Sequence, residues 1–503
     1  MWNNIISAIQ MFCTLSNAAG LIIGLLVGIV IGAIPGLGPT LVIALAMPMV
    51  ISLPATTAII TLIGVYVGGI YGGSISAIWI NTPGTPAAAA TTLDGYQMRK
   101  KGLAMRALKL SLWASIFGHF FGSICLFFAA EPLSRVSLKF GPAEQFALVL
   151  FALTIISVIA GKDKKKGLVS AVFGLLFVLI GTDPITGSRR MNFGTLYLAD
   201  GVELFALLIG LFALPEVFKQ LADIFFGKKE GKTEQIKYDF NNREDNLSLK
   251  EFFSHFWLLI RSSIIGTFIG ALPGIGSGTS VFVAYGWAQK LSKHPETFGE
   301  GSPEGIIAAE SANNACCGGA MVPLLSLGIP GDTVTAVLLG ALVMQGMAPG
   351  PLLFSQQGDK VRVIYLGIFC CGVLLMLFGR AILKSSTLIA AVNPRILWPV
   401  ILIVCILGVY SANGSMFDVY LMLAFGVMGY LMNKYKFPGG PMIISFILGE
   451  LLEKSLRQAL LRTRNDFFVL FKNSTLFTIF MALAVLMIVF PVIKNAVQNR
   501  NRK

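Results

Sequence analysis

Gly32-Ala33-Ile34-Pro35-Gly36-Leu37-Gly38 and Gly270-Ala271-Leu272-Pro273-Gly274-Ile275-Gly276 are two copies of one pattern, G-A-[IL]-P-G-[IL]-G. Both copies lie in apolar sequence, where proline removes an N–H from a helix ladder and glycine permits unusual backbone angles. In a bilayer an unsatisfied backbone group costs several kcal/mol, so such an interruption persists only where protein, water or ligand satisfies it. The pattern predicts a membrane protein whose helices are broken at defined places.

A second pair of motifs follows the first in the same order. Gly72-Gly73 precedes Thr82-Pro83-Gly84-Thr85, and Gly318-Gly319 precedes Ile329-Pro330-Gly331-Asp332. The order indicates an internal duplication; the alternative is chance similarity among Gly/Pro-containing membrane helices. We expect residues 1–226 to form a first membrane repeat, 227–250 a hydrophilic cytoplasmic linker, and 251–503 a second repeat with C-terminal helices. Parallel and inverted arrangements of the repeats both stay open.

Composition also places the chain in a membrane. Of 503 residues, 55% are hydrophobic and only 13% are charged, and the mean hydropathy is +0.76; soluble proteins carry roughly a quarter charged residues. The net charge of +14 is distributed in short clusters between apolar runs, such as Lys162–Lys166. That distribution is typical of cytoplasmic loops and not of a nucleic-acid-binding face.

Segments of about 20 apolar residues predict membrane-spanning helices. The expected fold is an all-α polytopic membrane protein with about twelve transmembrane helices in two repeated halves with re-entrant or broken helices. A stretch near 438–452 is predicted to be a short span or a re-entrant piece. The expected spans lie near 17–34, 55–80, 104–130, 142–160, 167–182, 199–220, 252–272, 304–327, 361–382, 388–410, 416–433 and 470–493.

Each break supplies helix N-termini, whose free N–H groups and positive dipole end attract anions. We predict a substrate site for carboxylates there; the alternative is that the hydroxyls and amides only hold helices together. The predicted substrate-binding residues are Gly36, Gly38, Thr40, Asn81, Thr82, Pro83, Gly84, Thr85, Gly274, Gly276, Ser277, Thr279, Pro330, Gly331, Asp332 and Thr333.

Ionisable and amide side chains inside apolar segments predict the site of a coupling ion. Glu310, Asn313, Asn314 and Asp332 are the candidates, for either Na⁺ or H⁺. Asp332 also suits a helix N-cap. Asp94 is predicted to form a turn or cap near the cytoplasmic surface. No cofactor is expected, and no metal beyond a transported Na⁺.

Catalysis is not expected. Ser277 follows Ile275-Gly276, so it lacks the glycine setting of an intramembrane serine nucleophile. No G-x-x-x-x-G-K-[ST] loop is present, so ATP hydrolysis by that route is excluded.

Several long motifs resemble one family, the large membrane subunit (TctA family) of tripartite tricarboxylate transporters. In the first half the matching stretches are Ile34-Pro35-Gly36-Leu37-Gly38-Pro39-Thr40, Tyr71-Gly72-Gly73-Ser74-Ile75 and Asn81-Thr82-Pro83-Gly84-Thr85-Pro86, continuing to Tyr96. In the second half they are 271–276, 299–305, Glu310-Ser311-Ala312-Asn313-Asn314-Ala315 and Leu327-Gly328-Ile329-Pro330-Gly331-Asp332. The likeness runs over nearly the whole chain.

The resemblance implies a permease subunit in the bacterial inner (cytoplasmic) membrane. Its implied partners are a small membrane subunit and a periplasmic solute-binding protein that delivers the substrate. The implied function is import of an organic carboxylate, such as citrate or a related anion, by cation symport without ATP. An anion exporter or channel that needs no binding protein is the alternative.

Overall fold

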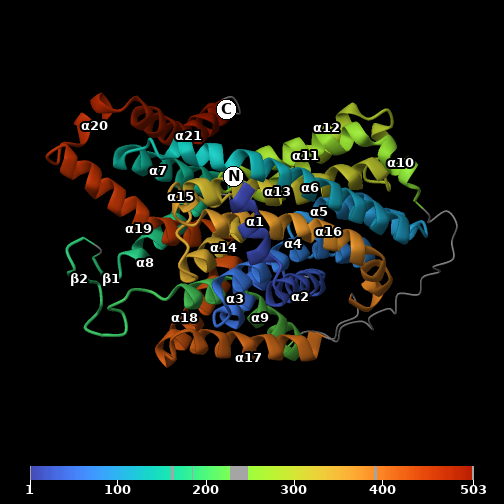
Figure 1. Cartoon of the computed structure of the whole chain (residues 1–503), viewed down its shortest axis with the longest axis horizontal. Coiled ribbons are helices and arrows are strands. Elements are labelled where there is room, and N and C mark those ends of the chain that lie inside the picture. Colours follow the sequence, from blue (N-terminus) through green and yellow to red (C-terminus); the bar gives the residue numbers. More distant parts are fainter. Residues whose placement is uncertain are drawn as a thin grey trace.

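The computed structural model is almost entirely helical (Figure 1). It describes residues 2–34, 36–159, 164–183, 185–226, 247–389 and 394–500. Pro35 of the first motif and residues 227–246 of the predicted linker lie outside the described residues.

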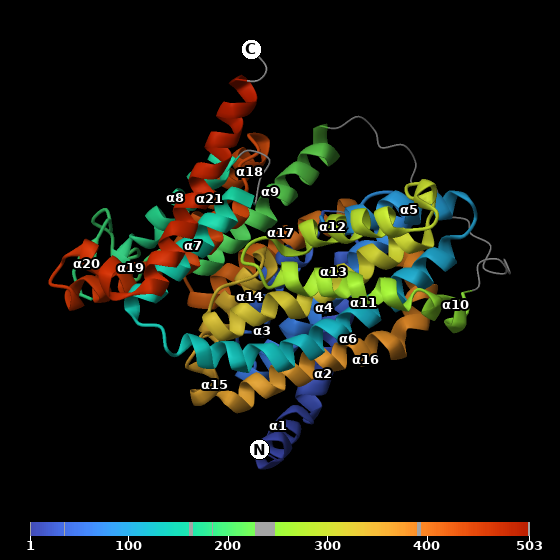
Figure 2. The same cartoon turned by 90° about the horizontal axis from the view of Figure 1, so that it is seen from above.

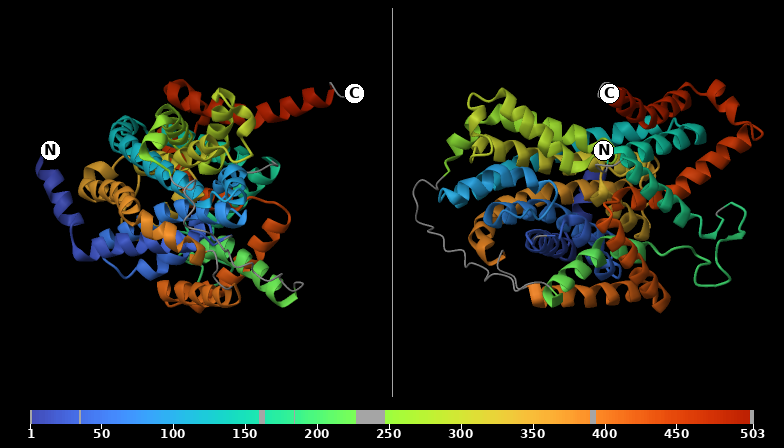
Figure 3. Two further views of the ribbon diagram at one scale, coloured as in Figure 1. Left: turned by 90° about the vertical axis from the view of Figure 1, so that its right-hand side faces the viewer. Right: turned by 180° about the vertical axis from the view of Figure 1, so that it is seen from behind.

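The described residues before the linker form nine helices and one short hairpin. Strands β1 (Gly181–Thr182) and β2 (Arg189–Arg190) pair antiparallel and stand away from the helices in Figure 3. The helices are α1 (Trp2–Phe12), α2 (Leu15–Gly32), α3 (Pro39–Val50), α4 (Ala55–Ile80), α5 (Ala88–Lys100), α6 (Ala104–Ser137), α7 (Pro142–Ile159), α8 (Lys164–Val178) and α9 (Leu204–Phe226).

The described chain after the linker forms twelve α-helices and one 3₁₀ turn at Pro295–Thr297. The α-helices are α10 (Leu249–Ser254), α11 (Phe256–Gly270), α12 (Gly276–Leu291), α13 (Pro303–Leu327), α14 (Thr333–Met344), α15 (Leu353–Gln356), α16 (Gly358–Ile389), α17 (Pro394–Asn413), α18 (Met416–Lys434), α19 (Gly439–Arg462), α20 (Phe467–Asn473) and α21 (Thr475–Arg500).

Every predicted span overlaps at least one helix, but the spans predicted at 252–272 and 470–493 are each divided between two helices, and residues 390–393 of the span predicted at 388–410 lie outside the described residues. Among the described residues, seven helices are long and apolar enough to cross a membrane: α2, α4, α6, α9, α16, α17 and α18. The pair α20 and α21, bent by 116°, makes an eighth when taken as one broken span. An all-α membrane protein is therefore confirmed, while the number twelve stays a prediction. The stretch near 438–452 is the beginning of one continuous helix, α19.

Glycines set the closest helix pairs, because a missing side chain lets backbones approach. A Cβ on Gly28 of α2 would lie 2.5 Å from the carbonyl oxygen of Val65 in α4. A Cβ on Gly122 of α6 would lie 2.5 Å from that of Ala315 in α13. Similarly, Gly210 of α9 lies against the backbone of α18. These close helix pairs belong to two bundles.

The first bundle contains α2, α4, α5, α6, α11, α12, α13 and α16, and the second contains α7, α8, α9, α17, α18, α19 and α21. Figure 2 shows them side by side, with α3 and α14 between them. Each bundle takes helices from both sides of residues 227–246.

The order of helices around the predicted breaks recurs. Helices α2, α3, α4 and α5 have 18, 12, 26 and 13 residues, and α11, α12, α13 and α14 have 15, 16, 25 and 12. In both series the third helix is the longest, and the second and fourth helices each follow a break.

Candidate functional site

Four interruptions of helices occur where the sequence predicts them. The first break (33–38) separates α2 from α3, and the second (81–87) separates α4 from α5. The third (271–275) separates α11 from α12, and the fourth (328–332) separates α13 from α14. Glycine is required where the backbone turns left-handed: φ is +87° at Gly36 and +77° at Gly274.

The breaks of each half pack against one another in the same way. Gly84 of the second break donates its N–H to the carbonyl of Gly73 in α4 (3.2 Å) and lies against the end of α2 at Gly32. Gly331 of the fourth break lies against Ala320 in α13 and the end of α11 at Gly270. Its carbonyl accepts from the N–H of Gly274 in the third break (2.7 Å). Both glycines fill spaces that a side chain would overfill.

Contacts also join breaks of different halves. The hydroxyl oxygens of Thr40 in α3 and Thr333 in α14 lie 3.4 Å apart. A Cβ on Gly278 in α12 would touch Pro86 of the second break at 3.7 Å. The starts of α3 and α14 therefore meet, as do the start of α12 and the second break, and the four breaks form one region.

The predicted substrate-binding residues differ in exposure within this region. Gly84, Thr85, Gly276, Pro330, Gly331 and Asp332 are buried. Gly38, Thr40, Pro83, Gly274, Ser277 and Thr333 are half-buried, and Gly36, Asn81, Thr82 and Thr279 are exposed. Asn81 has left-handed backbone (φ 56°) and ends α4, so its backbone role is that of a helix C-cap. The Thr85 hydroxyl accepts from the N–H of Ala88 (3.1 Å) at the start of α5.

Glu310 is fully buried in α13, and three hydroxyls donate to its carboxylate. Ser74 of α4 donates to Oε1 (2.6 Å), Ser115 of α6 donates to Oε2 (3.1 Å), and Thr91 of α5 donates to Oε1. Asn314 donates its Nδ2 to Ser115 (2.8 Å). No basic side chain among the described contacts balances the carboxylate.

Two predicted ion ligands carry unpaired polar atoms in the protein interior. Neither amide atom of Asn313 has a hydrogen-bond partner among the described residues, nor does Oδ1 of Asn314. The hydroxyl of Tyr71 in α4 is also unpaired there. Buried polar groups are nearly always hydrogen-bonded, so unpaired atoms of this kind indicate a ligand or water.

The register of α4 and α13 places Tyr71 near Asn313. Ser74 donates to Glu310, and Tyr66, two turns earlier in α4, lies close to Cys317, two turns later in α13. The two helices are therefore antiparallel, and Tyr71 and Asn313 lie at the same level. Amide, hydroxyl and carboxylate oxygens are the ligand types that hard cations take. Within the described residues no group of three or more His, Cys, Asp or Glu side chains is suited to a metal.

Asp332 acts as the N-cap of α14. Its Oδ1 accepts from the N–H (2.7 Å) and the hydroxyl (2.7 Å) of Thr335, and that hydroxyl in turn accepts from the Asp332 N–H (2.9 Å). This is a capping box. The N-cap alternative is thus realised, and a role of Asp332 for an ion stays a prediction.

The prediction that Asp94 forms a local turn is wrong. Asp94 is completely buried in the middle of α5, and it accepts from Tyr285 (2.8 Å) of α12. Its Oδ1 accepts backbone N–H groups of Gly299, Gly301 and Ser302 at 2.7–2.9 Å. The carboxylate anchors the loop before α13 to α5, a contact that no local sequence pattern predicts.

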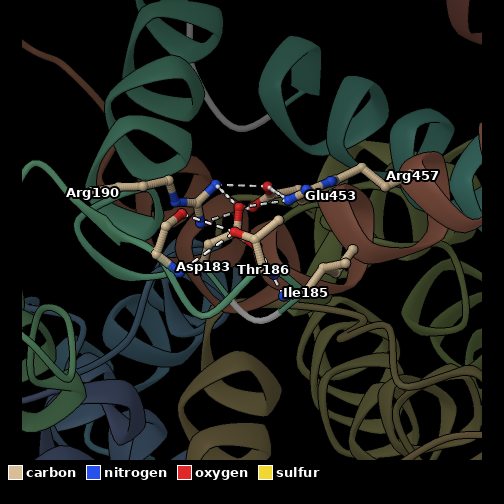
Figure 4. A network of polar contacts seen from close by, with 7 residues as sticks. Asp183, Ile185, Thr186, Arg190, Glu453 and Arg457 are labelled. Atoms are coloured by element: carbon tan, nitrogen blue, oxygen red, sulfur yellow. Dashed lines mark hydrogen bonds and ion pairs between the residues drawn. The ribbon is translucent and has the colours of Figure 1, made fainter.

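A network that the sequence did not indicate joins the hairpin to α19 (Figure 4). Asp183 accepts from the N–H of Thr186 (3.0 Å) and from Arg457 (2.7 Å), while Arg190 pairs with Glu453 (2.7 Å). These backbone and guanidinium donors lower the pKa of the Asp183 carboxyl well below its usual range. Arg190 and Glu453 also border a cavity of about 400 Å³.

Comparison with known proteins identifies one family. Residues 19–444 match the tripartite tricarboxylate transporter TctA family. An Agrobacterium vitis protein, the uncharacterized 52.8 kDa protein in the TAR-I ttuC' 3' region, is 36% identical over 417 residues, which is 83% of this chain and 82% of that protein. A second, the uncharacterized protein in the TAR-II ttuC' 3' region of A. vitis, is 35% identical over 208 residues, 41% of this chain and 86% of that protein.

No solved structure was found to match the chain. The family match spans all four breaks as well as Glu310 and Asn313. With its several long apolar helices, the chain is a multi-pass membrane protein that belongs to the tripartite tricarboxylate transporter TctA family.

Proposed function

We propose that this chain is the permease of a three-component system that imports an organic carboxylate across a bacterial inner membrane by cation symport. The substrate class is a tricarboxylate such as citrate, or a related anion. The observation that carries the proposal is the contact of Thr40 with Thr333, which brings together the starts of two helices from different halves.

The region of the breaks suits an anion. A helix N-terminus carries about half a positive elementary charge and unpaired N–H groups. The N-termini of α3 and α14 lie side by side, and their mutual repulsion is relieved when an anion binds between them. Hydroxyls of Thr40, Ser277 and Thr333 are half-buried there and suited to donate to carboxylate oxygens. The other residues predicted for substrate shape the backbone of this cradle.

The coupling cation is proposed to bind near Glu310, Asn313 and Asn314, with Asp332 as a further candidate. An isolated buried charge is very costly, so a buried carboxylate without a basic partner favours a state with a bound cation. The Oδ1 atoms of Asn313 and Asn314, which have no hydrogen-bond partner among the described residues, supply neutral oxygens beside it. Either Na⁺ or H⁺ satisfies this requirement.

The two halves are proposed to be structural repeats, residues 1–226 and 251–503 joined by the linker 227–250. The recurring order of helices and breaks supports this, as does the matched packing of Gly84 on Gly32 and of Gly331 on Gly270. Broken helices at corresponding positions of repeats are typical of binding sites in secondary transporters.

The proposed partners are a small membrane subunit and a periplasmic solute-binding protein. The family's tripartite composition supports the presence of further components. Substrate selection is then shared between the binding protein and the breaks of this chain.

Uptake of radiolabelled citrate into proteoliposomes tests the proposal. The vesicles contain this chain and the small membrane subunit, and the binding protein is added outside, with a Na⁺ gradient, a proton gradient or neither. Accumulation that requires the binding protein and one gradient supports import by symport. Uptake without the binding protein or any gradient contradicts the proposal and favours a channel or exporter. Absence of citrate uptake under both gradients rejects citrate as the substrate, and the assay is then repeated with other di- and tricarboxylates.

A further inference from the structure

Glu216 is a carboxylate in the middle of an apolar helix. It lies in α9, whose residues 204–224 are long and apolar enough to cross a membrane. It directly follows Pro215, and its side chain is only 20% exposed. Ionisable residues at such depth are rare and mark functional positions.

Glu216 contacts the first break. A Cβ on Gly36 would lie 2.7 Å from Oε1 of Glu216. The side chain of Gln220, one turn further along α9, donates to the same oxygen (2.8 Å). Among the described residues Oε2 accepts no hydrogen bond. One oxygen is therefore fixed beside the break and the other is available.

The corresponding place in the second half carries no charge. Gly274 of the third break, which has the same left-handed backbone as Gly36, lies against Ile156 of α7. The pair of equivalent breaks is thus chemically unequal, with a carboxylate at the first and an aliphatic side chain at the third.

We propose that Glu216 binds a small monovalent cation, Na⁺ or H⁺, beside the first break. This inference rests on the proposed function. An uncompensated carboxylate beside the first break repels an anionic substrate, and a bound cation removes the repulsion. Glu216 belongs to the second bundle and Gly36 follows α2 of the first, so the cation sits where the two bundles meet.

A plain ion pair with Lys219 is the competing explanation. The Lys219 ammonium lies 3.9 Å from Oε1, and its side chain is 61% exposed. Such exposed pairs contribute little in water. Helix α3, which packs against α9, carries no titratable side chain. Within the described residues, the titratable side chains on the other helices packed against α9 are Cys405 and Tyr410 on α17, Asp418, Tyr420, Tyr430 and Lys434 on α18, and Glu450, Glu453, Lys454, Arg457 and Arg462 on α19.

Infrared difference spectroscopy on the purified full chain tests the inference without any substrate. Spectra are recorded between Na⁺ and choline buffers at one pH, and in choline between about pH 6 and about pH 8, a range in which an ordinary glutamate stays ionised and gives no signal. The proteins are the wild type, Glu216→Gln, and Lys219→Gln as the matched control. A Na⁺-induced shift of a carboxylate band assigns Na⁺, whereas conversion of a carboxylate band to a carboxyl band assigns a proton.

The expected result is a carboxylate signal in one arm that the wild type and Lys219→Gln share and Glu216→Gln lacks. Identical difference spectra for the wild type and Glu216→Gln in both arms overturn the inference, as does loss of the signal in Lys219→Gln. Because no citrate is present, failure here leaves the proposed import function to be judged by the uptake assay alone.

Discussion

The hydroxyl oxygens of Thr40 and Thr333 lie 3.4 Å apart, although 293 residues separate them in the chain. Thr40 is the second residue of α3 and Thr333 the first of α14, so the pair marks the place where helix N-termini of the two halves meet. Both halves of the chain therefore contribute to the polar surface at this place.

Removing these hydroxyls is expected to weaken substrate binding. Thr40→Val and Thr333→Val keep side-chain volume but delete a hydrogen-bond donor each. A lost hydrogen bond to a charged group costs about 1.5–3 kcal/mol, so the KM for uptake should rise at least tenfold with little change in thermal stability. Thr478→Val, a hydroxyl in α21 far along the chain, is the control; equal KM values for all three variants would argue against contact with substrate.

Asn313 offers a way to separate ion binding from helix packing. Its amide makes no hydrogen bond in the described structure, so Asn313→Ala should unfold at nearly the same temperature as the wild type in Na⁺-free detergent solution. If the amide ligates Na⁺, the rise in unfolding temperature on adding NaCl should shrink in this variant. A lower unfolding temperature in choline chloride, with the Na⁺ response intact, would instead assign Asn313 to packing.

Gly331 is expected to tolerate no side chain. A Cβ there would lie 2.7 Å from the Cα of Ala320, which is backbone and cannot move aside. Overpacking of this kind costs about 1–3 kcal/mol, so Gly331→Ala should lower the unfolding temperature. Gly286→Ala in α12 is the matched control, since a Cβ there meets nothing within 4 Å; equal unfolding temperatures for the two variants would mean that the fourth break is not packed as described.

The hairpin should depend on pH through Asp183. Its pKa is lowered in the folded protein, first by the Thr186 N–H and then by Arg457. The stabilisation is therefore fully present above the unfolded-state pKa of about 3.9 and is lost as pH falls through the lower folded-state value. Amide hydrogen exchange in residues 181–203 should be faster in Asp183→Asn than in the wild type at neutral pH, and the difference should diminish in acid. A difference that grew as pH fell would contradict this sign.

Local sequence signals predicted the helices and the breaks well. The repeated G-A-[IL]-P-G-[IL]-G pattern located the first and third breaks, because glycine and proline act on the backbone at their own positions. Helix capping is also a local property. Asn81 ends α4 and Asp332 begins α14, and aspartate is a preferred N-cap residue.

Contacts between distant segments could not be predicted from one sequence. The distant contacts of Asp94 and Glu216 had no local signal. Asp94 accepts from Gly299, 205 residues away, and Glu216 of α9 lies beside Gly36 of the first break. Ser74 and Ser115 surround Glu310 from α4 and α6. In the sequence, Ser74 and Ser115 appear only as hydroxyls within apolar helices. Many such hydroxyls donate to a backbone carbonyl of their own helix, so their position alone does not predict a contact with Glu310.

Protection of a thiol introduced by Thr40→Cys tests the central claim, that the breaks bind the substrate, most directly. In a background in which Cys13, Cys125 and Cys370 are replaced by Ser, the rate of alkylation is measured with the carboxylate identified by the uptake assay and its driving cation. The account predicts that alkylation slows several-fold at saturating substrate, with half-protection near the KM for uptake. An unchanged rate in vesicles that still take up the substrate would contradict it.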